Sequence, residues 1–165
     1  MSLKKSLALA LVAATCFVHF KNPADGSHLY LLNEDKPEGA TDGSDGYARD
    51  SRGEKYPIGV VIHGPGSIVH RKAEDFNANA NIKAGRKHIT GATLRADATR
   101  LLARCTEMFV NFEYNGQDVT EKTTMEERER IASAFYEDTE YVAFREQVLE
   151  EQVDLGNFSK RESTG

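Results

Sequence analysis

The pattern of apolar and polar positions changes along this chain, from strand-like alternation in the first third to a helical spacing afterwards. Residues 15–20 and 28–33 alternate, and the segment between them, Asn22-Pro-Ala-Asp-Gly26, contains the Pro and Asp-Gly typical of tight connections. These two segments predict a hairpin. Residues 57–63 are rich in β-branched side chains and predict a third strand that pairs with it.

Apolar residues at intervals of three and four predict helices in the rest of the chain. Ser67 is a good N-cap for the first of them, and Thr124 with Glu127 forms a capping-box pattern at the start of the third. The second starts after Thr93 and carries the widest apolar stripe, and Gly156-Asn157 is expected to end the fourth. The expected helices cover residues 67–84, 94–112, 125–135 and 141–155.

Together these elements predict an α+β fold, with a small N-terminal antiparallel sheet of about three strands followed by a bundle of three to four helices. We expect a single domain over residues 15–158 of the 165. Residues 34–55 are rich in Asp, Glu and Gly and poor in apolar side chains, so they are predicted to form a mobile loop. Residues 1–14 would be an N-terminal arm, and residues 159–165 a flexible tail.

The N-terminal arm also has the features of a secretion signal. Lys4 and Lys5 precede an apolar run at residues 7–14, and Ala13-Ala-Thr-Cys16 is a possible processing site. Against this, the apolar run is short and Thr15 matches a lipoprotein site poorly. An exported lipoprotein or periplasmic binding module therefore stays open as an alternative.

The charge is distributed in blocks, although the chain as a whole carries only −5. Residues 66–106 have eight basic and three acidic side chains, whereas residues 107–158 have four and fourteen. Such blocks could pair within one fold or between copies stacked head to tail. The basic block lacks interleaved aromatic residues and any nucleic-acid-binding motif, so no nucleic-acid partner is expected. No apolar run approaches the roughly 20 residues of a membrane-spanning helix, so no membrane partner is expected either.

Candidate chemical groups favour a protein that is not an enzyme. Gly64-Pro-Gly-Ser67 lies between a strand and a helix but lacks the motifs of dinucleotide or phosphate loops, so a capped turn is the simpler interpretation. Cys16 and Cys105 fit no zinc or redox spacing and predict two reduced, partly buried thiols. No pairing of a nucleophile with a base is detectable, and neither a metal nor a cofactor is expected. The five histidines also lack metal-ligand spacing; they are His19, His28, His63, His70 and His88.

The order of these features resembles the tail assembly chaperones of tailed bacteriophages. The resemblance starts with the turn at residues 22–26 and the Gly-Pro-Gly-Ser67 turn, and continues with a long apolar-striped helix around Cys105. It ends in Phe144-Arg-Glu-Gln-Val148 and Asn157-Phe158. The chain departs from the family pattern because it contains no Trp, where many relatives have one near Phe112 and another near Tyr141.

The resemblance implies a function without chemistry in the host cell cytoplasm during phage assembly. Proteins of this family coat the tape measure protein, keep it soluble and help recruit the major tail protein, which forms the tail tube. We would then expect a homo-oligomer that binds these two partners. The client or self-association surface is predicted to include Tyr141, Phe144, Val148 and Phe158, although core packing is an equal alternative for Phe144 and Val148. A structural minor tail or connector protein, retained in the virion, is the first alternative, and the exported protein described above is the second.

Overall fold

The computed structural model describes residues 15–23, 41–42, 45–85 and 90–164, with the side chains of all of these except 41–42 and 155–164. Within these ranges the strands are β1 (Thr15–His19), β2 (Thr41–Asp42), β3 (Ala48–Arg49), β4 (Gly59–His63) and β5 (Thr106–Val110). The helices are α2 (Ile68–Lys83), α3 (Gly91–Cys105), α4 (Met125–Glu137) and α5 (Val142–Thr164), with a 3-10 turn at Thr139–Tyr141 between the last two. The predicted α+β fold is confirmed.

The main sheet has three antiparallel strands in the order β1-β4-β5. Val60 in the middle of β4 lies opposite Val18 of β1 and Phe109 of β5. Residues 59–62 are all buried, as expected of a central strand. The predicted strand at residues 57–63 therefore exists and pairs with the first strand, whereas the predicted strand at residues 28–33 lies outside the described residues.

Close approach of β1 explains the glycine at the start of β4. A Cβ atom at Gly59 would lie 1.9 Å from the carbonyl oxygen of Val18 and 3.0 Å from the Phe17 ring. Any side chain at this position would push the two strands apart. The strand pair therefore depends on glycine here for reasons of space.

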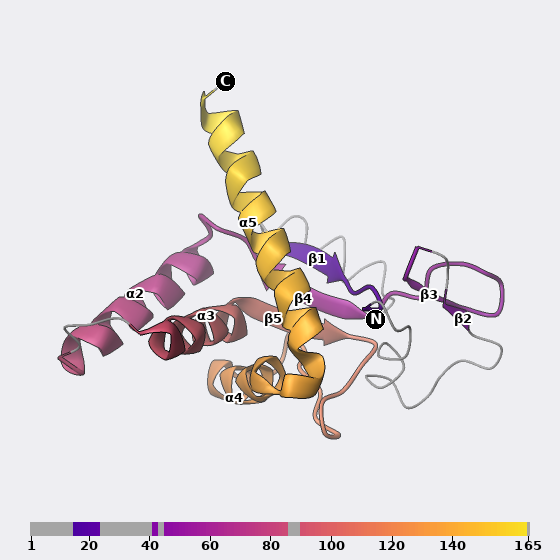
Figure 1. Ribbon diagram of the computed structural model, residues 1–165, viewed down its shortest axis with the longest axis horizontal. Helices are drawn as coiled ribbons and strands as arrows, with labels where there is room; N and C mark the ends of the chain where they lie inside the picture. Colours follow the sequence, from indigo (N-terminus) through magenta and orange to yellow (C-terminus); the bar gives the residue numbers. More distant parts are fainter. Residues whose placement is uncertain (1–14, 24–40, 43–44, 86–89, 165) are drawn as a thin grey trace.

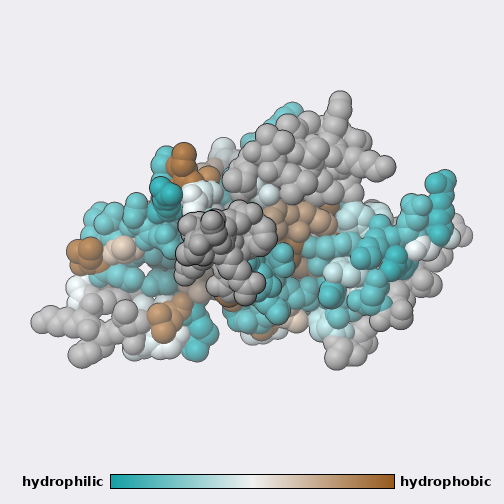
Figure 2. All heavy atoms as spheres, turned by 90° about the horizontal axis from the view of Figure 1, so that it is seen from above, coloured by the Kyte–Doolittle hydropathy of each residue, from teal (hydrophilic) through white to brown (hydrophobic). Residues whose placement is uncertain are grey.

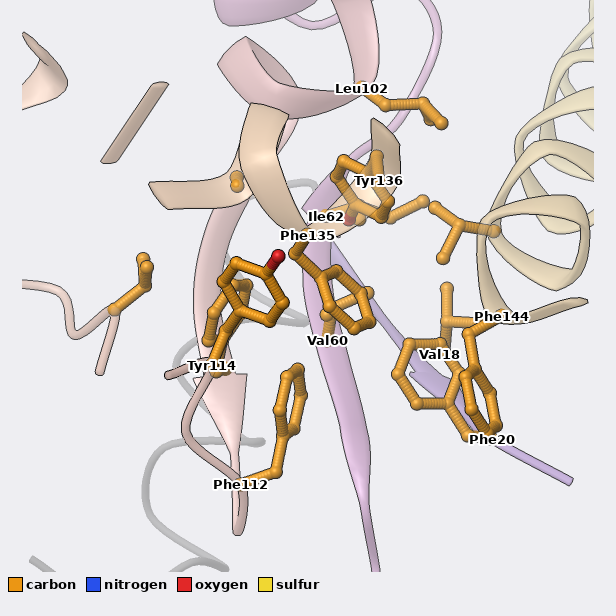
Figure 3. Packing of buried hydrophobic residues seen from close by; sticks show 14 of the residues in the cluster. Val18, Phe20, Val60, Ile62, Leu102, Phe112, Tyr114, Phe135, Tyr136 and Phe144 are labelled. Carbon is orange, nitrogen blue, oxygen red and sulfur yellow. The ribbon is translucent and has the colours of Figure 1, made fainter. Parts of the chain in front are cut away.

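Helices α3, α4 and α5 contribute to one hydrophobic core with the sheet (Figure 1). Rings dominate this core, and Phe135 of α4 lies at its centre (Figure 3). The Phe135 ring centroid is within 6.4 Å of six other aromatic rings. Those rings belong to Phe20, Phe109, Phe112, Tyr114, Tyr136 and Tyr141. The core thus joins the first strand to the last helices.

Local capping signals explain where two of the helices start. The Ser67 hydroxyl accepts a hydrogen bond from the His70 N–H, and the Thr124 hydroxyl accepts one from the Glu127 N–H. Both N-caps were predicted and both are confirmed. A tight turn lies at Asn115-Gly116, where both residues have positive φ between Tyr114 and Gln117, which exchange backbone hydrogen bonds.

The predicted helix at residues 94–112 is wrong at both ends. It begins earlier, at Gly91, where the Thr90 hydroxyl accepts a hydrogen bond from the Thr93 N–H. It ends at Cys105, and residues 106–110 form β5 instead. Phe109 and Val110 are favourable strand residues, and pairing with the buried β4 outweighs the local helical spacing. The long apolar stripe is therefore shared between a helix and a strand.

The C-terminal prediction also needs correction. We expected the last helix to stop at Gly156-Asn157, but α5 continues to Thr164 and projects beyond the rest of the fold (Figure 1). Lys160 and Arg161 are good helix formers, and one interior glycine costs only about 1 kcal/mol. Within the predicted loop at residues 34–55, the described part includes β2 and β3, and Ala48 of β3 is buried against the core.

Candidate functional site

Two of the four predicted contact residues are buried in the core. Phe144 and Val148 are completely buried in the core, where the Phe144 ring lies 4.9 Å from that of Phe20 (Figure 3). Tyr141 is half-buried and packs against the same core, and the Phe158 side chain lies outside the described residues. Phe144 and Val148 therefore follow the core-packing alternative. Their helical spacing reflects packing of α5 on the sheet.

Helix α2 carries exposed apolar side chains that do not pack into the core. Its buried residues are His70, Ala73 and Asn77, while Ile68 and Ile82 are 71% and 76% exposed. This is the reverse of an ordinary surface helix, which turns its apolar side toward the protein and its polar side toward water. The exposed apolar residues of α2 are therefore unlike the isolated ones that most surfaces carry.

Polar contacts with α3 hold α2 in this orientation. The Asn77 side chain donates to the carbonyl oxygen of Asp97 over 2.9 Å, and the Asn81 side chain donates to the Asp97 carboxylate over 2.9 Å. Arg100 of α3 donates to the Asn77 oxygen. The amide side chains at the contact between the two helices therefore find their hydrogen-bond partners within that contact. As a result, apolar positions of α2 lie on its outer side.

The two helices extend away from the sheet as a pair (Figure 1). Because Asn81 near the end of α2 contacts Asp97 in the first half of α3, the helices run side by side and their connected ends form the distal tip of the pair. Ile82 and Leu94 lie at this tip, and Leu94 is 57% exposed. We call these two residues the apolar tip. Figure 2 shows hydrophobic side chains standing among hydrophilic ones on the side where α2 and α3 lie.

A second cluster joins β4, β5 and α4 through charge. His63 Nε2 lies 2.5 Å from Glu107 Oε2, and Arg128 Nη1 lies 3.4 Å from the same oxygen. Arg128 also donates to the Thr123 carbonyl oxygen. The hydrogen bond from His63, helped by the Arg128 charge, holds the pKa of Glu107 below its ordinary value of 4.5. The three side chains bind one another and the backbone, and the Ser67 hydroxyl is engaged as a helix cap, so the cluster fits a structural role.

This cluster predicts a pH-dependent contribution to stability. A carboxyl group whose pKa is lowered by folding stabilises the protein above its unfolded pKa, and this stabilisation is lost as the pH falls through the folded pKa. We expect Glu107→Gln to lower the urea midpoint at neutral pH, and the difference from wild type to shrink below about pH 4. Urea unfolding followed by circular dichroism, at neutral pH and at about pH 4, measures this difference in midpoint. The exposed Glu113→Gln is the control. A difference that does not change with pH would contradict the assignment.

The cysteines are free and poorly suited to nucleophilic chemistry. Cys16 is half-buried in β1 and Cys105 is buried at the end of α3, which confirms the expectation of two unpaired thiols. Burial raises the pKa of the Cys16 thiol to about 11 and that of Cys105 to about 12. Both thiols are therefore protonated at neutral pH, whereas the reactive species is the thiolate.

No group of three His, Cys, Asp or Glu side chains that could hold a metal ion occurs in the described ranges. In the same part of the chain, no helix combines the length and apolar character needed to cross a bilayer. The feature that stands out is therefore the apolar tip. No sequence signal marked it in advance, except that the Asn-Ala repeats at residues 77–81 placed amides where a core-facing helix usually has apolar residues.

Comparison with known proteins identifies no relative of this chain. No family model, no curated protein and no solved structure matches the sequence. The resemblance to tail assembly chaperones rests on the sequence motifs alone.

Proposed function

We propose that this chain is a non-enzymatic assembly chaperone of tailed bacteriophages, which binds the tape measure protein and helps recruit the major tail protein in the host cytoplasm. The orientation of α2 is the observation that carries this proposal, because this helix turns amide side chains toward α3 and apolar side chains toward solvent. A helix pair that projects from the fold with Ile82 and Leu94 exposed provides a surface for an apolar partner. The resemblance of the sequence to tail assembly chaperones implies that this partner is the tape measure protein.

The apolar tip suits a client that is itself helical and partly apolar. Amphipathic helices commonly bind by laying apolar residues onto a matching apolar surface. Two exposed side chains give weak binding at one position, but many copies along one long client give avidity. The acidic C-terminal third would keep such an assembly soluble through its net negative charge.

The geometry of Cys16 weighs against the export alternative. Lipid attached at Cys16 requires cleavage before this residue, but here Cys16 lies within β1, opposite Ile62, and packs against the core. Attachment of a lipid would therefore disturb the first strand of the sheet. Intact-mass measurement of the protein from expressing cells distinguishes the two, because a lipidated or shortened chain has a different mass.

Co-expression with the neighbouring reading frames, followed by affinity capture of this chain, tests the proposed function. We expect capture of a very long, helical protein and, with it, the tail-tube protein. Absence of the chain from purified mature particles is expected of a chaperone, whereas its retention would favour a minor tail or connector protein. A chain that captures no long helical protein under these conditions would contradict the proposal.

A further inference from the structure

A cavity of about 350 Å³ lies between β1 and the middle of α5. Its wall on the β side includes Phe17 and Tyr47, and its helical wall includes Glu150, Glu151 and Asp154. Gln147, another lining residue, joins the two walls: its side-chain oxygen accepts from the Lys21 N–H and its side-chain nitrogen donates to the Lys21 carbonyl oxygen, both over 2.8 Å. The cavity is therefore a formed feature of the fold, lined by rings on one side and carboxylates on the other.

The cavity carries negative charge that the described residues do not neutralise. Glu150, Glu151 and Asp154 make no ion pair within the described part of the chain, and Lys21 is the one cation among the lining residues. His19 also lines the cavity, and burial lowers its pKa, so the ring is neutral near pH 7. Its Nε2 atom is buried without a hydrogen-bond partner in the same part of the chain. The surface as a whole favours a cationic partner with an apolar part.

The first turns of α2 provide such a partner. Ile68 is 71% exposed, and Arg71 and Lys72, three and four residues later, lie on the same side of the helix and are exposed. Neither Arg71 nor Lys72 makes an ion pair among the described residues. The next position on this side, Asp75, is acidic and therefore has a charge opposite to that of Lys21 in the cavity. The two surfaces match in sign and in their combination of charged and apolar groups.

These two surfaces cannot meet within one molecule as it is folded. In Figure 1, α2 lies on one side of α5, and β1 and β3 lie on the other. We propose that the α2 face formed by Ile68, Arg71 and Lys72 docks into the β1–α5 cavity of a second copy of this chain. Because different surfaces meet, the contact is head to tail and can repeat to form a row of copies.

The two halves of this contact leave the apolar tip free. Ile82 lies at the opposite end of α2 from Ile68, so copies arranged in a row keep their tips available to another molecule. The contact goes beyond the proposed function, because it requires no client and no phage protein. If the self-association experiment fails, the proposal of client binding is unaffected. If client capture fails, the proposed self-association is unaffected.

Sedimentation velocity of the full-length chain tests the contact. We expect wild-type protein to associate with rising concentration at about 50 mM NaCl and much less at about 500 mM, since salt screens exposed charges. Glu150→Lys with Glu151→Lys, or Arg71→Glu with Lys72→Glu, should each weaken association at least tenfold. Lys83→Glu, an exposed charge at the other end of α2, is the matched control and should leave it within about twofold of wild type.

Mixing the two double variants gives the sharpest result. The first keeps an intact α2 face and the second an intact cavity, and the two reversed surfaces also match each other in charge, so a mixture should associate into alternating rows although each variant alone does not. Combining all four substitutions in one chain reverses both charges and should restore self-association. Circular dichroism of each variant verifies that the fold is retained. A wild-type chain that stays monomeric at low salt, double variants that associate as wild type does, or a mixture that does not associate would each overturn the proposal.

Discussion

Phe135→Ala is expected to remove about 4 kcal/mol of folding stability, the largest loss for any single core truncation in this chain. Phe135 is completely buried, and its ring lies among six others from the residue after β1, from β5, the following loop, α4 and the turn before α5. Truncation would leave a cavity where all these elements meet. Since domains are stable by about 5–15 kcal/mol, this loss is a large part of the total.

Urea denaturation followed by circular dichroism measures this loss, because the chain has no Trp to report by fluorescence. Phe76→Ala is the matched control. Phe76 is 42% exposed and packs against the Arg104 guanidinium at 3.6 Å, so its truncation should cost about 1 kcal/mol or less. Equal losses for the two variants would mean that the aromatic cluster is not the centre of the core.

Ile82→Glu with Leu94→Glu is expected to weaken capture of the client by at least about a hundredfold. Burial of an apolar side chain of this size contributes about 1.5–3 kcal/mol, and each 1.4 kcal/mol corresponds to a factor of ten in affinity. A carboxylate placed against an apolar client adds a desolvation cost. Quantitative affinity capture at several concentrations of this chain measures the change.

The fold of this double variant should be unchanged, because both side chains are already exposed. Met125→Glu is its control: Met125 is also an exposed large apolar residue, at 44%, but it lies at the start of α4, away from the tip. Its capture of the client should equal that of wild type. Loss of capture in this control as well would indicate a general effect of added negative charge.

Sequence reasoning worked where a local signal decides the structure. The starts of α2 and α4 follow from the hydroxyl groups of Ser67 and Thr124, which cap the next turn whatever lies elsewhere in the fold. It failed for residues 106–110, where the apolar spacing fits a helix as well as a strand. Pairing with β4, more than forty residues earlier, selects the strand, and no local pattern contains that information.

The contact surface shows the same limit. Phe144 and Val148 have the spacing of an interaction stripe, but the spacing of a core stripe is identical, and only the packing of α5 against β1 distinguishes them. Helix α2 shows the opposite error, because its apolar residues are exposed where a core position would be expected. They face solvent because α3 presents polar side chains to the other side of α2. Asp97 and Arg100 attract the amides of α2 inward. A sequence does not reveal which neighbour a helix will have.

The solubility of the client in the presence of this chain tests the central claim most directly. The captured client would be denatured, diluted with and without the purified chain, and centrifuged, and the fraction left in solution would be measured. We predict that wild-type chain keeps the client in solution and that the variant with Glu at positions 82 and 94 does not. If that variant protects the client as well as wild type does, or if neither protects it, the apolar tip is not a chaperone surface.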